Sequence, residues 1–260
     1  TYDTPSATNS KISGSAVTIA TADAKIRTTA FNYTQNPSKP FGTNKAQEYT
    51  RKPQLGRGKG TEFDYQREKK TVELARDIEM MLLADQDRTQ PTSSVAGQCR
   101  GALQWITTNV VNAAVGGKAQ PLARSMFESA MAKAWGQGGS PGVVFANISQ
   151  KLAFAHLVTP TGRTIDETGK KIVEVVNQFE TVGGMTDIVL NPRMDQGSLL
   201  VMDMNFWFTA WLFGYEFERL GEDGSGPRGY VEAELTVEAR NQASSAKAIN
   251  LTFTDYGTPA

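Results

Sequence analysis

The most regular alternation of apolar and polar residues lies near the C-terminus, over residues 230–240. Its odd-numbered positions are all apolar, and its even-numbered positions are charged or polar after a tyrosine at the start. A period of two over this length predicts a strand with one buried face and one solvent-facing face. The most apolar segment of the chain, residues 199–217, comes before it and has room for a partner strand. We therefore expect a sheet core within residues 199–253.

A helical period of apolar residues is clearest over residues 61–85. Thr61 and Asp64 have approximately the spacing of a capping box, which marks the start of a helix. Apolar residues then cover about half of the helical wheel. At about 1.5 Å per residue the predicted helix spans roughly 35 Å, which is long enough to form the spine of a domain.

The remaining elements are shorter and follow no repeating order. Residues 26–54 predict two strands around a long exposed loop, a protruding hairpin, because residues 36–42 carry a strong turn signal. Residues 55–60 predict a hinge. Further helices are expected over 122–135 and 149–156, and further strands over 143–146, 172–182 and 186–190. This order indicates an α+β fold rather than a regular array of βαβ units.

Length and charge narrow the function classes. A chain of 260 residues can bury a sizeable core, either as one large domain or as two intertwined subdomains. The net charge is zero, yet residues 1–60 carry nine Lys or Arg and three Asp or Glu, which leaves eighteen and twenty-four for the remainder. A basic segment on an acidic body is compatible with nucleic-acid contact, with docking on a neighbouring copy, or with a solvated tail.

No residue pattern predicts catalysis, a cofactor site or a metal site. Cys99 and His156 are the only cysteine and the only histidine, and both are interpreted as packed side chains. The glycine-rich residues 55–60 lack the spacing of a phosphate-binding loop. Asp203 and Glu216 interrupt the apolar run 199–217, which argues against a membrane span. We therefore expect a protein that is not an enzyme and has no membrane partner.

Four stretches, in this order, resemble the major capsid proteins of tailed bacteriophages, most closely the family typified by phage SU10. The first is the tetrapeptide at residues 32–35 (NYTQ), and the second is an E-x-x-YQ-x-x-K-x-x-x-EL-x-RD-x-E-x-x-L pattern that starts at Glu62. The third covers Ala134-Trp135, two glycines, Pro141 and the predicted strand 143–146. The fourth combines residues 200–203 (LVMD), Trp207 and residues 236–243 (TVEARNQA).

This resemblance implies the Hong Kong 97-like capsid fold and a set of domain boundaries. The expected parts are an N-terminal arm (1–25), an extended hairpin loop (26–60), a peripheral domain with the spine helix (61–121), an axial domain (122–198) and C-terminal strands that return to the peripheral domain (199–260).

The resemblance also implies a function in assembly. Copies would join as hexamers and pentamers into an icosahedral head that encloses phage double-stranded DNA without sequence-specific contact. The protein would reside in the virion and assemble in the host cytoplasm, with scaffolding, portal and cement proteins as further candidate partners. Two alternatives stay open: an encapsulin-like compartment shell, and a nucleic-acid-binding protein that uses its basic N-terminal arm.

The candidate inter-subunit contacts combine basic residues of the first 60 with carboxylates on the solvent-facing side of the strand at 230–240. They are Arg27, Lys39, Lys45, Arg51, Lys52, Glu232, Glu234 and Glu238. In this interpretation the acidic strand face receives the arm or hairpin of a neighbouring copy. Reversing Glu232 and Glu234 to Lys would then leave the fold intact and impair assembly.

Overall fold

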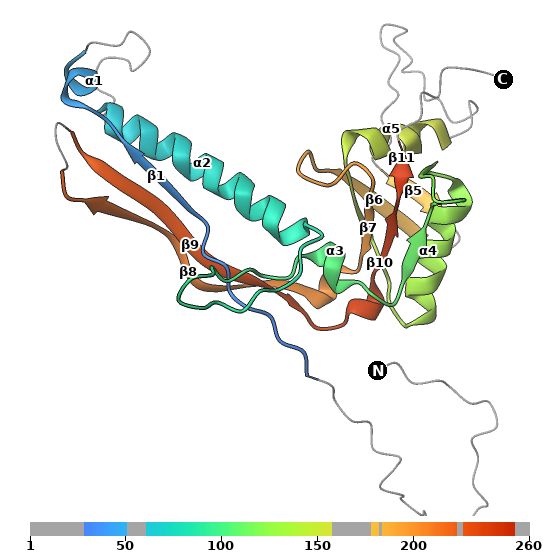
Figure 1. The fold of residues 1–260 in the computed structure, drawn as a ribbon. Coiled ribbons are helices and arrows are strands. Elements are labelled where there is room, and N and C mark those ends of the chain that lie inside the picture. The colour runs from blue at the N-terminus through green and yellow to red at the C-terminus, as the bar shows by residue number, and fades with distance from the viewer. Residues whose placement is uncertain (1–28, 51–60, 158–177, 182–183, 223–225, 253–260) are drawn as a thin grey trace, which may run out of the picture. The chain divides into compact units, whose positions relative to one another are not determined.

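The computed structural model describes residues 29–50, 61–157, 178–181, 184–222 and 226–252. The expected N-terminal arm, the hinge at 55–60 and the first part of the strand expected at 172–182 lie outside these ranges. The chain divides into two units, Thr1–Phe31 and Asn32–Ala260, and the elements below belong to the second (Figure 1). Within the described residues of this unit, the strands form sheets of three, six and two strands.

The three-stranded sheet is built on a long antiparallel ribbon. Strand β8 (Trp207–Leu220) pairs with β9 (Arg228–Ala239), and β1 (Ser38–Gly42) pairs with the other side of β9. The alternation predicted for β9 is confirmed, because Val231, Ala233, Leu235 and Val237 are all buried while the glutamates between them keep part of their surface exposed.

Helix α2 (Glu62–Leu83) covers the buried face of this sheet (Figure 1). Leu74, Ile78 and Met81 of the helix share one apolar cluster with Val231, Ala233 and Leu235 of β9. The predicted capping box is present, since the Thr61 side chain accepts from the Asp64 backbone N–H and the Asp64 carboxylate accepts from the Thr61 backbone N–H. Hydrogen bonds that the Thr61 backbone N–H and hydroxyl donate to the Asp64 carboxylate lower the pKa of Asp64. The helix predicted over 61–85 is therefore confirmed.

An aromatic cluster joins β1, α2 and β8 near the start of the helix. The ring centroids of Phe41 and Phe63 are 4.9 Å apart, and the Phe217 ring lies 5.9 Å from both. Gly229 of β9 leaves room for this cluster, because a Cβ at that position would lie 2.8 Å from a carbon of the Phe217 ring. The cluster therefore depends on a residue without a side chain.

A short helix, α1 (Lys45–Tyr49), is attached to the same end of α2. The Glu48 carboxylate accepts from the Phe63 backbone N–H at 3.0 Å and from the Thr43 hydroxyl at 2.5 Å. One side chain thus satisfies an otherwise unpaired N–H in the first turn of α2 and fixes α1 beside it.

The six-stranded sheet has the order β2-β10-β7-β4-β6-β5. Helices α4 (Arg124–Gly136) and α5 (Ile148–Leu157) pack on one of its faces. On that face the ring centroids of Phe127, Phe154 and Phe179 lie within 5.5 Å of one another. Its strands are β2 (Val110–Asn112), β4 (Val143–Ala146), β5 (Gln178–Thr181), β6 (Gly184–Leu190), β7 (Leu199–Met202) and β10 (Ala246–Ile249). The two-stranded sheet pairs β3 (Gln120–Pro121) with β11 (Leu251–Thr252) in parallel.

The second face of the six-stranded sheet shares a core with the ribbon. Leu200 and Met202 of β7 pack with helix α3 (Ala102–Trp105), with Trp207 of β8 and with Val237 of β9. Leu82 and Leu83, at the end of α2, pack against the same cluster. One apolar cluster therefore connects the two sheets.

The apolar run 199–217 does not form a single strand. It divides after Met202 into β7 and β8, which belong to different sheets and are joined by a 3-10 turn at Met204–Phe206. Asp203 starts this turn, because its buried carboxylate accepts from the Asn205 and Ser140 backbone N–H groups. Of the strands in residues 199–252, β8 and β9 lie in the sheet beneath α2, whereas β7 and β10 join the six-stranded sheet. The return of the C-terminal strands to a peripheral domain stays a prediction.

The described part of residues 26–54 does not form the expected hairpin of two strands. Residues 38–42, predicted as part of a turn, form the edge strand β1, which pairs with β9, and α1 follows. Pro40 fits there because an edge strand leaves one row of backbone N–H groups unpaired, so a missing donor costs little. Residues 29–50 contain no second strand of a hairpin.

Replacing Gly229 by Ala should destabilise the packing of α2 on the ribbon. The new Cβ would meet the Glu218 carbonyl oxygen and the Phe217 ring, both at 2.8 Å, and such overpacking costs about 1–3 kcal/mol. Gly214→Ala on β8 is the matched control, because nothing lies within 4 Å of the added carbon; its cost should stay below about 0.5 kcal/mol. Denaturant unfolding of the two variants measures the difference, and equal stabilities would contradict this account of the packing.

Candidate inter-subunit interface

The basic candidates that the structure describes lie on β1 and α1. Lys39 is already paired within the chain, because its Nζ is 2.5 Å from Asp77 Oδ2 of α2. Lys45 is the first residue of α1 and is exposed. Arg27, Arg51 and Lys52 lie outside the described residues. Of these two lysines, Lys45 is the one that lies exposed and forms no ion pair with a described residue.

The acidic candidates on β9 are also engaged by the same chain. Glu232 Oε2 accepts from the Asn36 side-chain amide at 3.1 Å, and Glu234 accepts from the Thr34 hydroxyl. Glu238 is exposed and pairs with Arg240 at 2.8 Å. Reversing Glu232 and Glu234 would therefore break contacts within the chain, so the expectation that this double variant leaves the fold untouched has no support in these contacts.

Two further carboxylates enlarge this acidic face. Glu216 of β8 lies directly opposite Glu232, and Glu218 accepts a hydrogen bond from the Tyr230 hydroxyl. That hydrogen bond, with a smaller contribution from the charge of Glu232, raises the pKa of Tyr230 to about 12. Sequence reasoning missed Glu216 and Glu218 because β8 has irregular register, which hides from the sequence which of its residues share a face with the β9 glutamates.

Strand β8 carries a second candidate surface, which is apolar. It is an edge strand, and within the described residues no strand pairs with its outer side. Edge strands of this length normally pair with another chain or are protected by charge. Trp207 is buried, but six of the other large side chains are 38–67% exposed: Phe208, Trp211, Leu212, Tyr215, Phe217 and Leu220. The sequence assigned this run to the core, and only its broken alternation could have signalled exposure.

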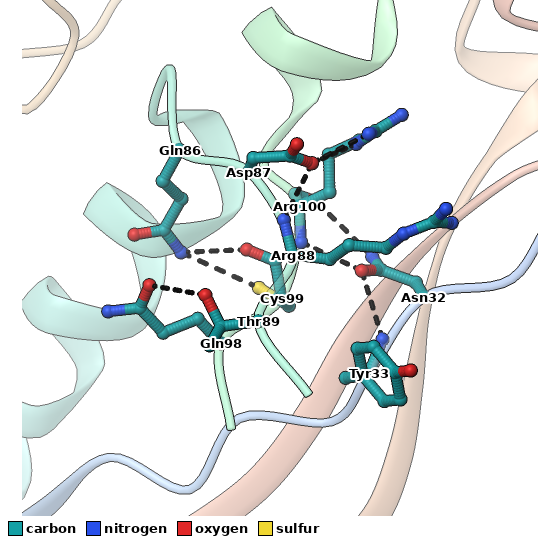
Figure 2. A network of polar contacts seen from close by, with 9 residues as sticks. All are labelled: Asn32, Tyr33, Gln86, Asp87, Arg88, Thr89, Gln98, Cys99 and Arg100. Atoms are coloured by element: carbon teal, nitrogen blue, oxygen red, sulfur yellow. Dashed lines mark hydrogen bonds and ion pairs between the residues drawn. The ribbon is translucent and has the colours of Figure 1, made fainter. Parts of the chain in front are cut away.

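A polar network fixes the segment that leads into β1 (Figure 2). The Asn32 side chain accepts from the Arg100 backbone N–H at 2.8 Å and donates to the Val237 carbonyl at 3.1 Å. Gln35 Oε1 accepts from the Cys99 backbone N–H at 3.1 Å and from Gln86 Nε2 at 3.0 Å. The tetrapeptide 32–35, one of the four stretches behind the family resemblance, therefore ties three distant parts of the chain together.

The two residues with the most reactive side chains have different surroundings. Cys99 is fully buried, as expected, and burial raises the pKa of its thiol. His156 lies in the last turn of α5 and is exposed, so its interpretation as a packed side chain is wrong. In the described part of the chain, no group of three or more His, Cys, Asp or Glu could hold a metal ion. Nor does any described helix have the length and apolar content needed to cross a bilayer.

Comparison with known proteins decides between the function classes. Residues 1–252 match the family model described as SU10 major capsid protein. The chain belongs to this family. It is therefore a major capsid protein, whose role is to form the capsid shell of a bacteriophage. A search of curated protein sequences finds no match.

Solved structures give the fold of this SU10-type capsid protein. A chain of the cyanophage A-1(L) capsid matches with TM-score 0.60 and 11% identity over 84% of this chain and 77% of that one. A Gordonia phage Cozz chain matches with TM-score 0.57 and 11% identity over 90% and 77%. The SrpI encapsulin of Synechococcus elongatus PCC 7942 matches with TM-score 0.56 and 12% identity over 88% and 77%. The expected Hong Kong 97-like fold is confirmed, and the family match separates this capsid protein from encapsulins, which share that fold.

Replacing Asn32 by Ala should weaken the attachment of the segment before β1. The change removes the partners of the Arg100 N–H and the Val237 carbonyl, and unsatisfied backbone groups of this kind cost about 1–3 kcal/mol each. Asn36→Ala removes one hydrogen bond between exposed groups and is the matched control; it should cost less than about 1 kcal/mol.

Amide hydrogen exchange of β1 and of residues 98–100 provides the local measurement. Faster exchange in Asn32→Ala than in Asn36→Ala is expected. The same exchange rates in both variants would show that the network does not hold this segment.

Proposed function

We propose that copies of this capsid protein join head to tail into hexamers and pentamers, and that these close into an icosahedral phage head around double-stranded DNA. The observation that supports the proposal is the apolar edge strand β8, whose outer side pairs with no described strand, in a member of a capsid family. Head-to-tail contacts close into rings when the rotation between copies is an exact fraction of a turn. An edge strand supports such contacts because its backbone groups can pair with an extended segment of the next copy.

The apolar side chains of β8 supply a driving force for this contact. Burial of apolar surface contributes about 25 cal/mol per Å², so 100 Å² contributes roughly 2.5 kcal/mol. Trp211, Leu212 and Tyr215 are 45%, 67% and 46% exposed and lie close together on one strand. A partner that covers them therefore gains free energy in addition to the backbone hydrogen bonds.

Charge would select the partner. Residues 51–60 carry four cations and no acidic residue: Arg51, Lys52, Arg57 and Lys59. In the sequence they lie between α1 and α2, two helices that Glu48 joins. We expect residues 51–60, together with Lys45 and Arg27, to contact Glu216, Glu218 and Glu238 on the acidic face of the next copy. Such complementarity favours the correct partner and the correct register.

The charge balance bears on the contents of the head. With zero net charge, the chain as a whole has no excess of positive charge to attract DNA. Packaged DNA would accordingly be enclosed without sequence-specific contact, in a virion assembled in the host cytoplasm. Scaffolding, portal and cement proteins are further proposed partners, and the shell role requires no catalysis.

Negative-stain electron microscopy of the purified full chain tests the proposal. Uniform closed shells are expected at micromolar concentration. Protein that stays monomeric at high concentration would contradict shell formation. Monomers that bind DNA with steep salt dependence would instead support the alternative of a nucleic-acid-binding protein. Particles from infected cells that hold enzyme and no DNA would favour a compartment shell.

A series of charge-reversed variants tests the proposed contact between residues 51–60 of one copy and the acidic face of the next copy. Arg51→Glu with Lys52→Glu should reduce the yield of shells at least about tenfold, because like charges now face each other. Adding Glu216→Lys and Glu238→Lys should restore much of that yield. Lys118→Glu, on an exposed turn between Val115 and Lys118, is the control and should assemble normally. Failure of the four-residue variant to regain assembly, with its circular dichroism unchanged, would show that the two charged surfaces do not meet.

A further inference from the structure

A concave pocket lies where the end of α2 meets strands of both sheets. Its volume is about 490 Å³, within the range of roughly 300–1,000 Å³ in which small-molecule sites usually fall. Its apolar lining includes Leu82 of α2, Phe145 of β4, Met202 of β7, Met204 of the following turn, Trp207 of β8 and Val237 of β9. All of these residues belong to one chain, so a single copy forms the whole pocket.

One side of the pocket is polar. Among the described residues that line it, Glu79 is the only charged one, and Asn191 and Thr209 add an amide and a hydroxyl. The Asn191 Nδ2 donates to Glu79 Oε1 at 2.8 Å, and Asn191 itself is 4% exposed. The buried amide of Asn191 thus orients the carboxylate of Glu79, a residue that is itself exposed.

We propose that this pocket binds a small amphipathic cation, with its apolar body against the methionine and aromatic side chains and its ammonium group at Glu79. Because Glu79 is exposed, its carboxylate can be reached by a ligand that enters the pocket. A hydrogen bond between an ammonium group and a carboxylate is stronger than one between neutral groups. Methionine side chains adapt to apolar ligands of different shapes, which suits Met202 and Met204 to this wall. The same carboxylate disfavours anionic ligands.

The volume and the single carboxylate together favour a free ligand over a side chain of another copy. A lysine would bring the positive charge but would leave most of the 490 Å³ unfilled. An aromatic side chain would fill more of that volume but would bring no positive charge to Glu79. A molecule that carries both an apolar body and a cation satisfies both parts of the site.

Binding would act on the junction between the two sheets. The ligand would contact α2, β4, β7, β8 and β9 at once, and these elements belong to the cluster that connects the sheets. A ligand that binds the folded chain stabilises it in proportion to the logarithm of its concentration. Phe208 and Thr209 of the lining belong to β8, whose edge the assembly proposal covers with a neighbouring copy, so binding has to be compared on dissociated chains and on assembled shells. Loss of binding by both would overturn the ligand proposal and leave the assembly proposal untouched.

Three dansyl compounds with different charges test the site on the full chain. Dansylcadaverine is cationic, dansylamide is neutral and dansylglycine is anionic, and all three emit more strongly and at shorter wavelength in apolar surroundings. Dansylcadaverine should bind once per chain, about tenfold or more tightly than dansylglycine. Glu79→Gln should weaken dansylcadaverine about tenfold and leave dansylamide unchanged.

A pair of tryptophan variants locates the binding. Thr209→Trp places a large ring on the pocket wall and should abolish binding of all three compounds. Leu212→Trp adds the same ring to the same strand away from the pocket and should bind as the unmodified chain does. If circular dichroism shows that Thr209→Trp does not fold, the affinities of Glu79→Gln for the cationic and neutral compounds decide the test alone.

Three results would overturn the proposal. Unchanged binding by folded Thr209→Trp would place the compounds on the exposed side chains of β8. Equal affinity for the cation and the anion would show that Glu79 does not select the ligand. Binding to dissociated chains but not to assembled shells would show that a neighbouring copy occupies the pocket.

Discussion

The burial of one face of β9 beneath α2 is the interaction on which the arrangement of this capsid protein depends. Strand β9 is the middle strand of its sheet, so both β1 and β8 are positioned by hydrogen bonds to it. Leu74, Ile78 and Met81 fix the helix over Val231, Ala233 and Leu235. Because side chains alternate along a strand, a shift of register by one residue would place the glutamates against the helix. The packing of this one face therefore determines the positions of the acidic face, the β8 edge and the helix together.

The sequence predicted the elements whose signals are local. The capping box at Thr61 and the alternation of β9 are visible within a few residues, and both are present in the structure. The family resemblance also predicted the Hong Kong 97-like fold, which the structure neighbours confirm. Strand β1 was missed because its partner is far away in sequence, with Pro40 opposite Tyr230. The division of the apolar run at Asp203 was missed because it depends on hydrogen bonds from Ser140 and on the register of two separate sheets.

The candidate contact residues show a similar limit. Sequence reasoning found the carboxylates of β9, but it could not show that Asn36 and Thr34 of the same chain already bind Glu232 and Glu234. It grouped Lys39 with the free cations, although Asp77 lies 2.5 Å away on α2. Glu216 and Glu218 joined the acidic face only once the pairing of β8 with β9 was known. Identities of charged residues are local information, whereas their availability to a partner depends on the whole fold.

The outer edge of β8, which pairs with no described strand, also makes the rate of assembly important. An edge strand with large apolar side chains can pair with almost any extended segment, including the same strand of an unfolded copy. Glu216, Glu218 and Arg219 interrupt the apolar side chains in its second half, and such charges discourage indiscriminate pairing. The first half, around Trp211 and Leu212, has no comparable protection. Under the proposed assembly, each chain is exposed to aggregation from the moment it folds until the next copy covers β8. Fast capture by a growing shell would then protect the protein as much as the stability of its own core.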